Sequence, residues 1–214
     1  MKPVNTHLIA ALAAGEESTR LKAALAIGSH PEPGLVDILL ARCAIDPDFY
    51  VRDILTWALT RLPSEITVPK LIVELRSERT QARSQALHTV SKIMDSSAWP
   101  AITRSLLRDP DDEVARSAWR AAVVLVPHGQ EKDLADELAA QLGRGDREVQ
   151  LSLSRALVAL GEEVIGPDLQ GAIASGDPGV RAHAIAMERL LRNPDVGSEN
   201  AVNQAKRIFA LGNE

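Results

Sequence analysis

Apolar residues recur along the chain with the three- and four-residue spacing that marks one face of an α-helix. The clearest copy starts at Val51-Arg52 and continues with apolar residues at Leu55, Ala58-Leu59 and Leu62. Two further copies start at Ala82-Arg83 and Val180-Arg181. Each copy predicts an amphipathic helix whose apolar stripe packs against a neighbouring element.

This pattern occurs six times at a nearly constant interval. In each copy one position, which we call the arginine slot, precedes the apolar stripe. The slot falls at residues 20, 52, 83, 115, 150 and 181, so successive copies are 31 to 35 residues apart. Alanine occupies the slot at position 115 and glutamine at position 150. A fixed period of this length is the signature of a helical repeat array.

A second apolar-periodic segment precedes each slot helix. We expect these first helices at about 4–14, 35–44, 67–76, 99–108, 131–142 and 165–174. Asp-Pro pairs stand between the two helices at Asp46, Asp109 and Asp177, where aspartate caps a helix and proline is tolerated at its first position. The sequence therefore predicts six helical hairpins, at about 4–30, 31–62, 63–93, 94–126, 127–161 and 162–192.

A last periodic segment lies beyond the sixth hairpin, at about 200–211. Helical arrays need such a segment to cover their final apolar face. We therefore expect it to form a C-terminal capping helix. With this helix included, residues 1–214 are predicted to form a single repeat domain.

The Asp-Pro, Val-Arg and Ala-Leu elements at this period resemble the HEAT repeat, most closely the short variety named after the phycobilisome lyases. The resemblance covers about residues 4–192 and implies an all-α, right-handed α-α superhelix, which is an armadillo-type solenoid. Such proteins include scaffolds, adaptors, bilin lyases, a di-iron hydroxylase and DNA glycosylases, so the fold by itself implies no activity. The resemblance also implies a structural ladder in which arginines pair with aspartates: Arg20, Arg52, Arg83 and Arg181 with Asp46, Asp109, Asp146 and Asp177.

Composition narrows the class of function. The 214 residues carry a formal net charge of −5, which argues against a dedicated nucleic-acid binder, although one face can still be basic. The single cysteine, Cys43, allows neither an intrachain disulfide nor a cysteine-based zinc site, and we expect a plain buried thiol. No apolar run is long enough to cross a bilayer, so we expect a cytoplasmic protein without a membrane partner.

The sequence lacks the patterns of the common catalytic and metal sites. None of its five histidines is followed by glutamate, and no two of them stand three or four residues apart, so we expect no metal site. A Ser/His/Asp grouping and a glycine-rich phosphate loop are also missing. We therefore expect a non-enzymatic protein with no catalytic residue and no cofactor.

The second helix of each hairpin lines the concave side in solenoids of this family, and the apolar pattern leaves part of that side free. Counted from the arginine slot, positions one and five residues later project together. In the second to fifth repeats these positions hold the candidate binding residues Asp53, Trp57, His88, Arg116, Arg120 and Arg155. Tryptophan beside several arginines is typical of an interaction hot spot. The alternative is that Trp57 packs on a neighbouring repeat and the arginines pair with local acids.

An acidic protein or peptide is the partner that this surface fits best. Three arginines and one aspartate are few for non-specific DNA binding, which draws on about six or more phosphate contacts. We therefore expect an adaptor or scaffold that binds its partner on the concave face. Two alternatives stay open: a DNA-binding or repair protein of the HEAT-like alkylpurine glycosylase class, with Asp53 and Trp57 as its carboxylate–aromatic pair, and a bilin-lyase-like binder of a small ligand.

Overall fold

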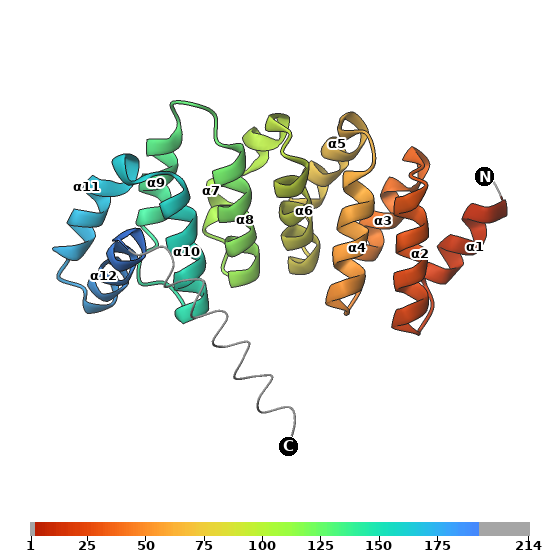
Figure 1. The fold of residues 1–214 in the computed structure, drawn as a ribbon, viewed down its shortest axis with the longest axis horizontal. Helices are drawn as coiled ribbons and strands as arrows, with labels where there is room; N and C mark the ends of the chain where they lie inside the picture. The colour runs from red at the N-terminus through yellow and green to blue at the C-terminus, as the bar shows by residue number, and fades with distance from the viewer. Residues whose placement is uncertain (1–2, 193–214) are drawn as a thin grey trace, which may run out of the picture. The chain divides into compact units, whose positions relative to one another are not determined.

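The computed structural model describes residues 3–192, and within that range it contains only α-helices, short 3-10 helices and turns (Figure 1). A first helix (A) and a second helix (B) alternate along the chain. The pairs are α1 (Pro3–Leu12) and α2 (Glu17–Ser29), α3 (Val36–Cys43) and α4 (Phe49–Thr60), α5 (Ser64–Glu74) and α6 (Thr80–Ile93), α7 (Arg104–Leu107) and α8 (Asp112–Leu125), α9 (Glu131–Ala139) and α10 (Arg147–Ala159), and α11 (Glu162–Ile173) and α12 (Pro178–Arg192). Two 3-10 helices, η1 (Pro33–Leu35) and η2 (Ser96–Ala101), precede α3 and α7. The predicted all-α class and its helical hairpins are confirmed, while the expected capping helix at 200–211 lies outside the described residues.

The described residues group into two compact units, which divide between Gln130 and Glu131. In the first unit the B helices α2, α4, α6 and α8 form one row in which each contacts the next, and α3 and α5 lie side by side in a second row (Figure 1). In the second unit α9 packs on α11 and α10 packs on α12. A single domain over residues 1–214 stays a prediction.

The core is built from the apolar positions of the repeat pattern. Val51, Leu55 and Leu59 of α4 are completely buried, and the residue three positions after the slot is buried in the other B helices as well, at Ala23, Ala86, Ala118, Leu153 and Ala184. Each large aliphatic side chain buried in this way contributes about 1.5–3 kcal/mol. Trp119 of α8 is the largest fully buried side chain, and its Nε1 donates to the Leu107 carbonyl at 2.8 Å, so the one polar atom of the indole is satisfied.

The arginine slot is the fourth residue of each of the six B helices. From this place Nη1 of Arg20, Arg52 and Arg83 donates to the carbonyls five and six residues earlier, at 2.7–3.2 Å. Arg181 donates to the carbonyl six residues earlier, and the Gln150 amide donates to the carbonyl five residues earlier. These carbonyls belong to the turn after helix A, where no helical ladder satisfies them. In these five repeats the slot residue therefore closes the turn between helix A and helix B, whereas Ala115 of the fourth repeat has no side-chain donor.

Two slot arginines also bind the next repeat. Nε and Nη2 of Arg20 donate to the two carboxylate oxygens of Asp46 at 2.9 and 3.1 Å, and Arg83 binds Asp109 in the same way. Asp46 is completely buried and also accepts from Arg42 at 2.7 Å. Burial acts to raise the pKa of the Asp46 carboxyl, but the hydrogen bonds from Arg20 and Arg42 outweigh it and hold that pKa below its ordinary value. Asp46 therefore stays charged and ties the first repeat to the second.

The other residues of the expected ladder act within their own repeats. Asp146 and Asp177 accept backbone N–H groups at the starts of α10 and α12, which makes them helix caps. Arg52 and Arg181 have no carboxylate partner among the described residues and donate to backbone carbonyls instead. The structure thus pairs two of the four arginines with aspartates.

The first helix of the fourth repeat differs from the predicted continuous helix over 99–108. The segment is a 3-10 helix, η2, which ends at Ala101 before a separate helix, α7, of only four residues. Pro100 has no N–H and disfavours helical backbone at the preceding residue. Thr103 then has extended backbone, and its hydroxyl accepts the Leu106 N–H to start α7. This part of the prediction was wrong because it weighed apolar spacing above the proline.

A buried histidine joins three segments of the second unit. Nδ1 of His183 in α12 accepts the Gly143 N–H at 3.0 Å, and its Nε2 lies 2.9 Å from both the Ser154 hydroxyl and the Gln150 carbonyl. Because Nδ1 accepts, Nε2 must carry the hydrogen of a neutral ring. Burial lowers the pKa of His183 more than the Gln150 carbonyl raises it. His183 is therefore a neutral structural connector.

We expect Asp46→Asn to lower the free energy of unfolding of the first unit by about 3–5 kcal/mol, because it removes the buried charge that Arg20 and Arg42 share. Asp37→Asn is the matched control, since it breaks an exposed pair with Lys70 and should cost less than about 1 kcal/mol. Urea unfolding followed by circular dichroism measures both.

The stabilisation by Asp46 is also expected to depend on pH. The folded-state pKa of Asp46 lies below its ordinary value of 3.8, so its stabilisation is complete above that pH and is lost as the pH falls through the folded-state pKa. The Asp46→Asn variant should lack this acid-sensitive part of the stability. Equal losses from the two substitutions at pH 7 would contradict the linking role of Asp46.

Candidate binding surface on the B helices

The exposed side of the B-helix row in the first unit carries five of the six residues expected to bind a partner. We call this surface the B-helix face and define it by Asp53 and Trp57 of α4, His88 of α6, and Arg116 and Arg120 of α8. Because these helices lie side by side in one repeat register, positions one and five residues after the slot project from the same side. Arg155 of α10 is exposed in the second unit.

Trp57 is partly a packing residue. A Cβ atom at Gly28 of α2 would lie 2.2 and 2.6 Å from Cζ3 and Cε3 of the indole, so the glycine gives the ring the space that it occupies. The Trp57 side chain still keeps 38% of its surface exposed. The Arg61 guanidinium lies 6.0 Å from the ring centroid, at the edge of cation–π range. The indole therefore packs on α2 with one part and faces solvent with the other.

Two exposed aromatic residues of α4 were missed by sequence reasoning. Phe49 and Tyr50 are 64% and 67% exposed and lie edge to face, with ring centroids 5.7 Å apart. Phe49, Asp53 and Trp57 are four residues apart and so follow one side of the helix. A register comparison would have found the pair, because three and two residues before the slot the other repeats have Glu17-Ser18, Thr80-Gln81, Asp112-Glu113, Arg147-Glu148 and Pro178-Gly179.

The two arginines of α8 differ in how their charges are compensated. Nη1 of Arg116 donates to the Glu113 carboxylate at 2.7 Å. Arg120 donates to neutral acceptors, the Arg116 carbonyl at 3.3 Å and the Ser117 hydroxyl at 3.1 Å, and has no carboxylate partner among the described residues. Partial burial lowers the pKa of Arg120. Its charge is less well stabilised than in water, so Arg120 gains when an anion approaches.

His88 is held neutral by its surroundings. Burial lowers the pKa of His88 first, and the positive charges of Arg120 and Lys92 lower it further, while Asp53 opposes them. At pH 7 the side chain is a neutral imidazole that can donate or accept a hydrogen bond. These charge interactions join side chains of α4, α6 and α8 across the B-helix face.

The described residues show little sign of reactive chemistry. Burial raises the pKa of the Cys43 thiol to about 12, so Cys43 is not a nucleophile at neutral pH. Within residues 3–192 no three histidine, cysteine or carboxylate side chains lie together in a way that suits a metal ion. Among the same residues, no helix has the length and apolar character that a membrane span requires.

Gly28→Ala should force the Trp57 ring out of its position and destabilise the first unit by about 1–3 kcal/mol, because the new Cβ would overlap the ring. In a Trp57→Ala background the same substitution should cost much less, since the indole atoms are gone and the Ala58 Cβ at 3.1 Å is the nearest atom that remains. A double-mutant cycle of urea unfolding measures the coupling. Equal costs in both backgrounds would show that the contact does not constrain Gly28.

Comparison with known proteins agrees with the repeat pattern. A family profile described as HEAT repeats matches residues 36–124. No curated protein sequence matches the chain. Among solved structures, the complex of CpcE and CpcF of phycocyanin lyase from Nostoc sp. PCC7120 is 22% identical, with 89% of this chain and 78% of that chain covered and a TM-score of 0.50.

Engineered repeat proteins are also similar to the chain. One engineered protein is 22% identical over 92% of this chain and 98% of its own, with a TM-score of 0.49. A designed armadillo repeat protein is 16% identical over 86% and 98%, with a TM-score of 0.44. At this identity the likeness to the phycocyanin lyase concerns the fold alone. The chain is therefore a helical-repeat protein that carries HEAT repeats over residues 36–124, as its repeat period predicted.

Proposed function

We propose that this protein is a non-enzymatic adaptor or scaffold that binds an acidic protein or peptide segment on the B-helix face. A HEAT-like repeat fold suggests a scaffold or binding role. The observation that carries the proposal is Arg120, an arginine on the surface whose guanidinium bonds only neutral acceptors in the described part of the chain. The charge of Glu113 acts on Arg120 from nearby. A carboxylate from a partner would add the charge-assisted hydrogen bond that no described side chain gives Arg120.

The face changes from apolar to cationic along the row of helices. Five residues after the slot stand Leu25 on α2 and Trp57 on α4, which are 40% and 38% exposed, and then His88 on α6 and Arg120 on α8. The apolar end favours an aromatic or aliphatic side chain of the partner, and the cationic end favours a carboxylate. Trp57 and Arg120 are also of the two residue types most enriched among interaction hot spots.

The helix spacing sets the spacing of the partner's groups. Packed helices lie about 8–10 Å apart, so α4 and α8, with α6 between them, place Trp57 and Arg120 about 16–20 Å apart. An extended chain advances about 3.3 Å per residue. The segment that fits therefore has an apolar side chain and an acidic side chain separated by about five or six residues.

Nucleic acid fits the B-helix face less well. Around His88 and Arg120 the charged side chains are Lys92, Arg116 and Arg120 against Asp53 and Glu113, an excess of one positive charge. About six or more phosphate contacts are typical of a DNA binder. A glycosylase role would also require Asp53 and Trp57 to enclose a base, whereas both lie exposed on one side of α4.

A bilin-lyase role stays open because a phycocyanin lyase structure shares the fold. This role makes a separate prediction, that the purified protein gains visible absorbance when mixed with a bilin. The proposed adaptor predicts no such change. The two functions are therefore distinguished by one spectrum.

A labelled ten-residue peptide with one leucine and, six residues later, two glutamates tests the proposal by fluorescence anisotropy. The double variant Trp57→Ala, Arg120→Ala is expected to abolish binding, and either single substitution should weaken it by about thirtyfold, as for a hot-spot residue. Replacing the glutamates of the peptide by glutamine should weaken binding to the parent protein but not to Arg120→Ala.

Arg147→Ala, on an exposed arginine of the second unit, is the matched control and should bind like the parent protein. Thermal melts of all variants verify that they fold cooperatively. Retained binding by the double variant would overturn the proposal. Salt-sensitive binding of duplex DNA in a gel shift, with no peptide binding, would favour the nucleic-acid function.

Peptide affinity is also expected to rise as the pH falls from 8 to 6. An acidic segment raises the pKa of His88 in the complex above its depressed value in the free protein, which lies below 6.5. The protonated form therefore binds more tightly, by tenfold for each pKa unit of difference. Titration calorimetry from pH 8 to 6 measures this dependence. His88→Asn should flatten the dependence of peptide affinity on pH. His30→Asn, at the exposed end of α2, is the control and should leave this dependence unchanged. If affinity still rises with falling pH in His88→Asn, His88 does not have this role.

A further inference from the structure

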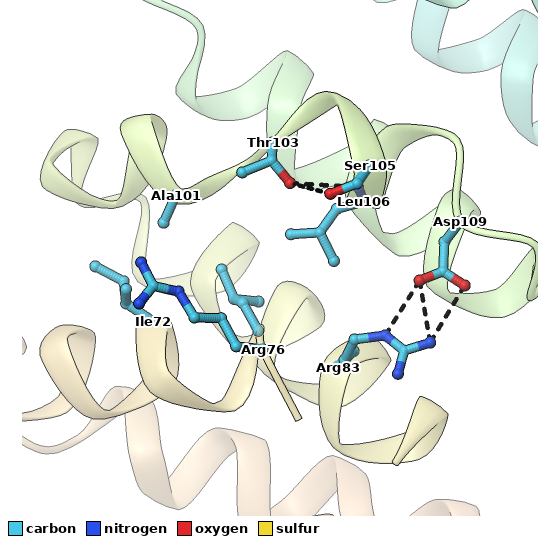
Figure 2. A pocket seen from close by; sticks show the side chains of 9 residues that line it. Ile72, Arg76, Arg83, Ala101, Thr103, Ser105, Leu106 and Asp109 are labelled. Atoms are coloured by element: carbon cyan, nitrogen blue, oxygen red, sulfur yellow. Dashed lines mark hydrogen bonds and ion pairs between the residues drawn. The ribbon is translucent and has the colours of Figure 1, made fainter. Parts of the chain in front are cut away.

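A cavity of about 270 Å³ lies between the end of α5, the start of α6 and the broken segment η2–α7 (Figure 2). None of the residues that line it belongs to the B-helix face. It opens beside the place where Pro100 and Thr103 interrupt the first helix of the fourth repeat. The cavity therefore lies between the third repeat and the fourth, whose first segment is the broken one.

Two arginines line this cavity, and their bonding differs. Arg83 is paired with a carboxylate: its Nε and Nη2 donate to Asp109, and its Nη1 donates to two backbone carbonyls. Arg76 follows α5, is exposed, and has no side-chain partner among the described residues. Figure 2 shows its guanidinium extending past Ile72 toward Ala101. The uncompensated positive charge of the cavity is therefore that of Arg76.

Two hydroxyl groups form part of the wall on the η2–α7 side. Thr103 Oγ1 and Ser105 Oγ lie 2.7 Å apart, so one of them donates to the other (Figure 2). Each hydroxyl has one hydrogen to donate, and the second hydrogen of the pair is therefore available to a ligand. This pair and Arg76 are thus hydrogen-bond donors that line the cavity.

The remaining wall is aliphatic, from Ile72, Leu75 and Leu106. The net charge of the lining is that of Arg76, because Arg83 and Asp109 neutralise each other. A doubly charged phosphate would lie near the Asp109 carboxylate with few donors to bind it, whereas a single carboxylate matches one guanidinium. The volume lies just below the usual range of ligand pockets, about 300–1,000 Å³, so the ligand is small.

We propose that this cavity binds a single carboxylate attached to a short aliphatic chain. Arg76 binds the carboxylate, the Thr103–Ser105 pair donates one further hydrogen bond to it, and Ile72, Leu75 and Leu106 contact the chain. A free aliphatic acid and the terminal carboxylate of a peptide that ends in an aliphatic residue share this chemistry. The site stands apart from the proposed adaptor function, since it uses none of the residues of the B-helix face.

Methyl-labelled full-length protein titrated with hexanoate tests the site by NMR. Hexanoate is expected to shift the methyl signals of Ile72, Leu75 and Leu106 saturably, and hexanol to bind roughly tenfold more weakly because it lacks the charge. A tripeptide ending in leucine and its amidated form distinguish the two sources. Tighter binding of the free-carboxylate peptide than of hexanoate identifies a peptide terminus, and the reverse order identifies a free acid.

Arg76→Gln should weaken hexanoate binding by roughly tenfold and leave hexanol unchanged. Ala101→Leu should fill the cavity and remove the binding of both probes. Arg79→Gln, an exposed arginine outside the cavity, is the matched control and should bind as the parent protein does. The absence of saturable shifts, or equal hexanoate affinity in Arg76→Gln, would overturn the proposal. Neither result bears on the B-helix face, which is tested through Trp57 and Arg120.

Discussion

The hydrogen bonds from the slot residue to its own A–B turn are the interaction on which the rest of the structure depends. They hold the starts of five of the six B helices against the turn that follows the preceding A helix, at Arg20, Arg52, Arg83, Gln150 and Arg181. The slot of α8 is Ala115, which has no side-chain donor, and Asp111 caps the start of this helix instead. Because the five bonded turns are alike, their B helices leave them in the same rotational register, and α8 packs on α6 beside them. Equivalent positions of neighbouring B helices then project in the same direction, and a surface with a repeating layout becomes available. The bonds to Asp46 and Asp109 add a second link, from one repeat to the next, at two places in the first unit.

This arrangement separates what the repeats share from what distinguishes them. The shared positions are buried or bonded to the backbone, so they constrain the scaffold and are not free to contact a partner. The distinguishing positions lie at the surface: exposed aromatic residues on α4, a half-buried neutral histidine on α6, and on α8 an arginine that bonds only neutral acceptors among the described residues. The fourth repeat differs in a second way, because its backbone departs from the pattern where the first helix is broken. This difference of backbone lies beside a cavity, whereas the differences on the B helices are differences of side chain. Both proposals therefore rest on departures from the repeat.

The sequence predicted more of the scaffold than of the surface. Helical periodicity located the hairpins, because the buried apolar stripe of a helix recurs every three or four residues. The slot is also at the same place in every B helix, its fourth residue. Prediction failed at the first helix of the fourth repeat, where Pro100 and Thr103 change the backbone locally. It also missed Phe49 and Tyr50, since an apolar residue outside the stripe is visible only when the repeats are compared position by position.

By itself, the sequence determined the all-α class, the period of the hairpins and some candidates for side chains that face away from the core. Only the tertiary structure decided what each of those side chains does. Gly28 and Trp57 come from different repeats, and their contact arises because α2 and α4 lie side by side. Arg116 and Arg120 look alike in the sequence, yet one is paired with Glu113 and the other is not. The physical reason is that helical spacing follows from neighbours along the chain, whereas burial and charge compensation follow from neighbours in space.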